Sequence, residues 1–179
     1  MKRTAALLSA AFAIAAIAAG GAGSATSKTS FAVFVEPTVT AASNGLTLET
    51  EMEGSFNVAA KTASGDGAYS LRAGSTVLET GTFTLTRLVA FQFYGCGEVT
   101  EEGEQISLPP DFCGGRAMFA VLAVSSTGEQ ATGLLEVNCQ IHNPGGQAPP
   151  GTSEGVKINA RGINFNKHVT GDNLLVMLP

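Results

Sequence analysis

Four polar side chains alternate with apolar ones along an expected strand at residues 132–142, and they form the best candidate binding site. Glu136, Asn138, Gln140 and His142 are two positions apart, so they share one face of the strand at intervals of about 7 Å. A row of this kind could bind a polar ligand such as a sugar. Sugar sites commonly add aromatic platforms, and the chain has no Trp and only two Tyr. We therefore predict a ligand-binding row without naming its ligand.

A nucleophile pattern stands near the middle of the C-terminal third. Gly151–Gly155 reads G-T-S-E-G and matches the G-x-S-x-G motif, with Ser153 as the central serine. That motif requires a sharp turn from a strand into a helix. Here two prolines precede the motif and a strand is expected after it. His142 and His168 could act as bases, but no third group can be placed beside either. No catalytic residue is therefore predicted.

Carboxylates are densest between the first two cysteines. Oxygen-rich clusters can bind Ca²⁺, but this spacing matches no EF-hand loop. Cys139 and His142 are three apart, so in a strand their side chains diverge and do not form a zinc pair. We predict no cofactor and no metal, with a weak calcium candidate in this loop. The loop carboxylates are Glu98, Glu101, Glu102, Glu104 and Asp111.

The three cysteines are Cys96, Cys113 and Cys139. Exported proteins meet oxidising conditions, in which thiols pair. A bridge between Cys96 and Cys113 would close the acidic loop at its base and leave Cys139 as a buried thiol on the apolar face of its strand. The alternative is Cys113–Cys139, because the strands that carry these two residues are expected to pair. We predict the first pairing.

Short alternating segments separated by Gly-rich turns must position these residues. From Phe31 onward we expect roughly eight to ten strands and no amphipathic helix. The predicted fold class is all-β, an antiparallel β-sandwich, with a closed β-barrel as the alternative. We expect residues 26–179 to form a single domain. In a closed barrel Phe83, Phe91 and Phe93 would line a cavity for an apolar ligand.

The longest strand signal covers residues 82–94. Phe83, Leu85, Phe91 and Phe93 share one parity, whereas Arg87 interrupts it. A β-bulge that turns Arg87 outward is the expected explanation.

The N-terminus predicts export. Met1–Arg3 is basic, an apolar run follows, and small residues end near Ala25. This is the pattern of a signal peptide at residues 1–25. The apolar run is shorter than the about 20 residues of a membrane span, and the apolar tail at residues 174–178 is far shorter, so no span is expected in the mature chain. The net charge of −5 disfavours nucleic acid and anionic membranes as partners.

These features favour a secreted, extracellular, non-catalytic β-sandwich that binds a protein, a glycan or a surface. The acidic loop, the 143–151 loop and the polar row are its expected contact surfaces. Two alternatives remain from the sequence. One is a β-barrel carrier of an apolar small molecule. The other is a secreted hydrolase that would use Ser153 or a carboxylate pair with a histidine.

Overall fold

The computed structural model describes residues 30–179, so the predicted signal peptide at residues 1–25 lies outside the described residues. The described chain is all-β, which confirms the predicted class. It contains no helix long and apolar enough to cross a membrane. The strands are β1 (Ser30–Ala42), β2 (Leu46–Asn57), β3 (Thr62–Ala73), β4 (Thr76–Cys96), β5 (Glu98–Glu101), β6 (Glu104–Ser107), β7 (Phe112–Ser125), β8 (Gln130–Cys139), β9 (Gly155–Ala160), β10 (Ile163–Thr170) and β11 (Asn173–Met177).

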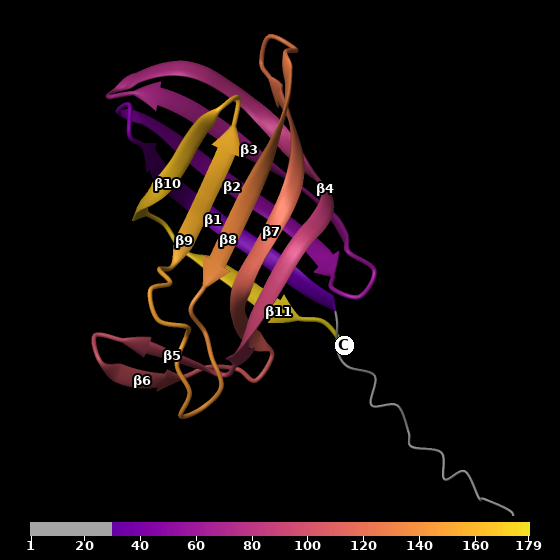
Figure 1. The fold of residues 1–179 in the computed structure, drawn as a ribbon, viewed down its shortest axis with the longest axis vertical. Coiled ribbons are helices and arrows are strands. Elements are labelled where there is room, and N and C mark those ends of the chain that lie inside the picture. Colours follow the sequence, from indigo (N-terminus) through magenta and orange to yellow (C-terminus); the bar gives the residue numbers. More distant parts are fainter. Residues whose placement is uncertain (1–29) are drawn as a thin grey trace, which may run out of the picture.

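Nine strands form one large antiparallel sheet whose hydrogen bonds run in a ring. The path follows β1, β2, β3, β4, β7, β8, β9 and β10, and β10 pairs again with β1. Strand β11 lies between the start of β1 and the start of β7. In Figure 1 the strands β1 to β3 pass behind β7 to β9, with the interior between these two groups. The ring gives every long strand two partners.

Strand β2 illustrates how the sequence pattern places the core. Leu48, Thr50, Met52 and Phe56 are buried, whereas the intervening Glu51 and Glu53 are exposed. Because successive side chains point to opposite faces of a strand, this alternation turns one face to the ring interior and the other to solvent.

Strand β4 contains the expected bulge. Its pairing with β7 shifts register between Leu85 and Arg87, and Arg87 is exposed, as predicted. The shift makes Leu88 the next buried residue. A second shift between Leu88 and Ala90 brings Phe91 back toward the interior. Bulges add one unpaired residue each and increase local twist, so they let this long strand follow the ring.

An aromatic cluster fills the ring near the start of β1. The Phe31 ring stacks on Phe56 with centroids 5.3 Å apart, and Phe91 lies 5.1 Å from Phe56. Phe119, which is 0% exposed, meets the edge of Phe56 at 5.4 Å. Aromatic rings from β1, β2, β4 and β7 therefore pack the interior at this end.

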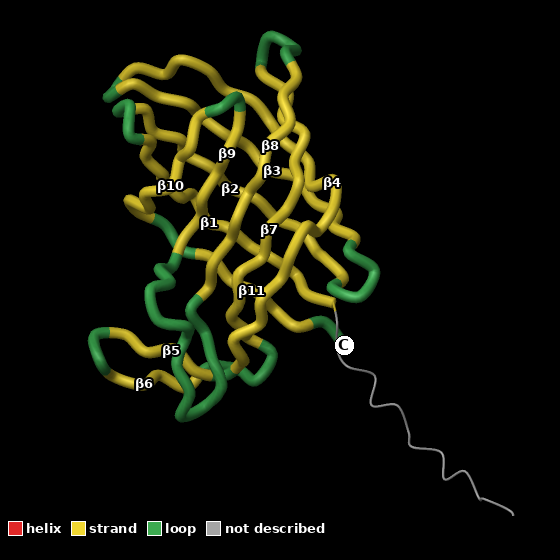
Figure 2. Tube along the Cα trace, viewed as in Figure 1, coloured by secondary structure: helices red, strands yellow, loops and turns green. Residues whose placement is uncertain are grey.

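The acidic loop is more regular than expected. It folds into the β5–β6 hairpin, and the described strands number eleven, against the expected eight to ten. The predicted Cys96–Cys113 disulfide joins the end of β4 to the start of β7 at the base of this hairpin. Cys139 is free and buried. Figure 2 shows the β8–β9 loop running beside the hairpin at the same end of the molecule.

Candidate functional site

The central members of the predicted polar row hold the β8–β9 loop. The Asn138 amide donates to the carbonyl of Ser153 and its Oδ1 accepts from the Tyr94 hydroxyl at 2.7 Å. The Gln140 amide donates to the carbonyl of Thr152 at 2.8 Å. Glu136, farther along, pairs with Lys157 at 3.2 Å. The side chains of Glu136, Asn138 and Gln140 therefore already have partners within the protein.

His142, the last member of the row, is buried rather than on the surface, with 2% of its area exposed. It lies opposite Glu98, and their backbones exchange two hydrogen bonds of 3.1 and 2.7 Å. Its Nδ1 is 3.0 Å from the carbonyl of Asn143 and 3.7 Å from the Glu98 carboxylate. Its Nε2 is 3.1 Å from the Thr100 hydroxyl. This contact set ties the β8–β9 loop to the β5–β6 hairpin.

The carboxylates of the weak calcium candidate do not share one position. Glu98 is buried and accepts the Gly145 N–H at 3.1 Å, while the remaining four are exposed. Among residues 30–179 no group of three or more His, Cys, Asp or Glu side chains is placed to hold a metal ion.

The serine motif lacks the backbone that its chemistry requires. Ser153 is exposed and is followed by β9, a strand. Its neighbour Glu154 turns inward, where its carboxylate accepts the Gln140 N–H at 2.6 Å. Burial, helped by the nearby charge of Asp172, raises the pKa of Glu154 to about 7. His168 lies on β10 and contacts neither Ser153 nor Glu154 through any described hydrogen bond.

Cys139 should be inert to thiol reagents while the protein is folded. Burial raises the pKa of its thiol to about 12, and the thiolate is the reactive form. We expect no reaction with Ellman's reagent at pH 8 in native buffer, and one thiol per chain in denaturant. Labelling of native protein at the rate of free cysteine would contradict the burial of this residue.

A pocket opens into the ring at the end opposite the aromatic cluster, and we call it the end pocket. Its volume is about 90 Å³. Of the three phenylalanines expected to line a cavity, Phe83 does so. Phe91 instead packs on Phe31 at 5.0 Å, and Phe93 is 50% exposed. Phe91 and Phe93 keep the parity that the sequence suggested, but they lie at the end of the ring that the aromatic cluster fills.

The walls of the end pocket come from strands on both sides of the ring. They are mostly apolar, with one buried hydroxyl, that of Thr50. The Thr50 Oγ1 has no hydrogen-bond partner among residues 30–179. The apolar lining residues are Leu48, Leu71, Phe83, Val121, Ala123, Ala131, Leu135, Ile158, Ala160, Ile163 and Phe165.

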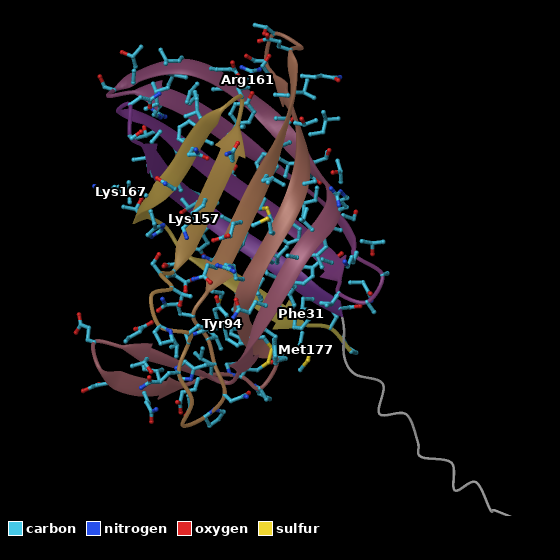
Figure 3. The ribbon with its side chains drawn as sticks, in the orientation of Figure 1. Phe31, Tyr94, Lys157, Arg161, Lys167 and Met177 are labelled. Atoms are coloured by element: carbon cyan, nitrogen blue, oxygen red, sulfur yellow. A yellow bond between two sulfur atoms is a disulfide. The ribbon has the colours of Figure 1, made fainter. Side chains whose placement is uncertain are left out.

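A polar network crosses the mouth of the end pocket. Tyr69 donates to Oε1 of Glu79 at 2.5 Å, and Arg161 donates to Oε2 of the same carboxylate at 2.9 Å. The other guanidinium nitrogen of Arg161 is 3.4 Å from Glu129. Arg161 lies in the β9–β10 turn, which Figure 3 shows at the upper end of the ring, and Glu129 lies in the β7–β8 turn. Three hairpins that are distant in sequence therefore meet here.

The network shifts the pKa values of Tyr69, Glu79 and Arg161. Burial and the hydrogen bond to Glu79 raise the pKa of Tyr69 to about 12. The hydrogen bonds from Tyr69 and Arg161 lower the pKa of Glu79, which is therefore ionised at neutral pH. Its contact with Glu79 raises the pKa of Arg161. At neutral pH the mouth holds one cation and two carboxylates.

Sequence reasoning did not single out Tyr69, Glu79 or Arg161. The residue pair Arg161-Gly162 reads as an ordinary turn, and both residues have positive φ, 51° and 75°. Glu79 stands 82 positions from Arg161 in the chain, so only the closed path of the strands brings them together.

Comparison of the chain with protein-family models, with curated proteins and with solved structures gives no match.

Proposed function

We propose that this protein is a secreted, non-catalytic binding protein that holds the apolar part of a small molecule in the end pocket. Of the functions considered from the sequence, the carrier of an apolar molecule agrees best with the geometry. The polar row, one of the three surfaces on which a surface-binding function would depend, already contacts the β8–β9 loop and Lys157.

One observation carries this proposal: aromatic rings pack together at one end of the ring interior, whereas an apolar pocket opens into the other end. The aromatic cluster fills the first end, whereas apolar side chains surround an unfilled volume at the second. Protein interiors are normally packed to the density of organic crystals, so an unfilled apolar pocket is unusual and is a candidate binding site for an apolar group. The unpartnered hydroxyl of Thr50 on its wall adds a polar group that a ligand could satisfy.

The size of the end pocket limits its occupant. A cavity of roughly 150 Å³ accepts benzene. At about 90 Å³ the end pocket fits a short or branched alkyl group rather than a whole lipid. The rest of the ligand would lie at the mouth, beside Glu79 and Arg161.

We also propose that the closed β-barrel describes this fold better than the β-sandwich. The return pairing of β10 with β1 and the long pairing of β4 with β7 support closure. Small barrels either fill their interior with side chains or hold one small ligand, so the proposed architecture and the proposed function are consistent.

Titration with a series of primary alcohols from butanol to decanol tests this function. We expect saturable NMR shifts of the methyl groups of Leu48, Leu135 and Ile158, since all three line the pocket. Ala123→Leu adds three carbons inside the pocket and should weaken alcohol binding at least about tenfold, which corresponds to about 1.4 kcal/mol.

Ala90→Leu is the matched control, because Ala90 is exposed on β4 and does not line the pocket. It should leave alcohol binding unchanged. The proposal would be refuted if none of the alcohols gave saturable shifts, or if the two variants bound the alcohols with equal affinity.

A further inference from the structure

We propose that the ligand of the end pocket carries a primary ammonium group, which binds the carboxylates at the mouth while its alkyl part fills the pocket. This inference rests on the proposed function and adds the chemical class of the ligand. It follows from the charges and the unused hydrogen-bonding capacity of the network at the mouth.

The charge at the mouth is negative. Arg161 is the single cation among the described residues that line the end pocket, and it faces both Glu79 and Glu129. Tyr69 is neutral, because its pKa is about 12. One guanidinium against two carboxylates leaves a net charge of −1, which attracts a monocation and repels a monoanion.

The two carboxylates at the mouth retain the capacity to accept hydrogen bonds from a cationic donor. Glu129 has one oxygen in a 3.4 Å contact with Arg161, and 70% of its side chain is exposed. A carboxylate accepts up to about four hydrogen bonds, so Glu79 and Glu129 both retain lone pairs. An ammonium group can donate three hydrogen bonds here while Arg161 stays in place.

A ligand carboxylate would meet the opposite situation. To bind Arg161 it would have to use the guanidinium N–H groups that Glu79 and Glu129 leave unoccupied. It would then lie beside two like charges. A fatty acid is therefore disfavoured, although its alkyl part is the same as that of the matching amine.

Three probes with the same alkyl chain test the inference: hexylamine, hexanol and hexanoate at pH 7 and low salt. We expect hexylamine to bind at least about tenfold more tightly than hexanoate, with hexanol between them. The preference should decrease as salt is added, because the mouth is partly exposed to solvent. Hexanol reports the pocket alone, so its failure to bind would count against the proposed function.

Two charge-removing variants locate the effect. Glu129→Gln removes one carboxylate at the mouth and should reduce the ratio of amine to carboxylate affinity by several-fold. Glu104→Gln removes an exposed charge from the β5–β6 hairpin, at the other end of the molecule, and should leave the ratio unchanged (Figure 1). Normal hexanol binding with hexanoate at least as tight as hexylamine, or a ratio unaffected by Glu129→Gln, would overturn the inference.

Discussion

Replacement of Phe119 by alanine is expected to lower the free energy of unfolding by about 3–5 kcal/mol. Phe119 is 0% exposed and its ring meets Phe56 edge-on at 5.4 Å. It lies on β7 between Leu88 of β4 and Leu135 of β8, both 2% exposed. Three strands therefore lose packing at once, and their backbone pairing restrains them from closing the gap. Urea denaturation followed by circular dichroism would measure the loss.

Phe93→Ala is the matched control, because it deletes the same side chain at a position that is 50% exposed. Phe93 still contacts Phe31, with centroids 6.0 Å apart, so a loss of up to about 1.5 kcal/mol is expected. An unchanged slope of the unfolding free energy against urea concentration would show that both variants expose as much surface on unfolding as the natural protein does. Equal losses of unfolding free energy for the two variants would mean that Phe119 is no more tightly packed than Phe93.

The strand pattern was predictable because it is local. Alternation in β2 identifies its buried face directly, and the misplaced charge of Arg87 was enough to predict a bulge in β4. The second register shift, between Leu88 and Ala90, has no such charge to mark it. Because the two shifts together restore the original parity, Phe91 and Phe93 remain on the same face as Phe83, as alternation suggests. Alternation does not show that both pack on Phe31 at the other end of the ring, where Phe93 is half exposed.

The polar row shows a different limit. Its side chains were predicted to share one face of a strand, but what covers that face depends on the β8–β9 loop. A Pro- and Gly-rich loop carries little local preference, and it is placed here by amides that reach its carbonyls at Thr152 and Ser153. The same contacts bury Asn138, which is 3% exposed.

The end pocket could not be predicted from local pattern at all. Its walls and mouth combine β2, β3, β4, β7, β8, β9 and β10, and Arg161 contacts residues 82 and 32 positions away. Closing the ring is a non-local event that alternation alone does not determine. The pairing of the cysteines was easier to predict, since the Cys96–Cys113 disulfide spans only 17 residues and closes a single local loop.

Glu154 connects the loop to the stability of the whole chain. Its carboxylate lies under the β8–β9 loop and accepts the backbone N–H of Gln140 at 2.6 Å. Burial disfavours its charged form, which is why its pKa rises from 4.5 to about 7. Between these two pH values the folded chain retains a proton that the unfolded chain has released.

The sign of the resulting pH dependence follows from that proton. This group's contribution to stability is fully present below pH 4.5, declines as the pH rises toward 7, and is constant above it. The total change in the free energy of unfolding is about 3 kcal/mol.

Glu154→Gln cannot ionise and keeps an oxygen that accepts the Gln140 N–H. We therefore expect the variant to match the natural protein at pH 4 and to exceed its free energy of unfolding by about 2–3 kcal/mol at pH 8. Urea denaturation of both proteins at the two pH values measures this difference, and Glu104→Gln, an exposed control, should show none. A difference for Glu154→Gln that is the same at pH 4 and pH 8 would mean that this carboxyl ionises as freely in the folded chain as in the unfolded one.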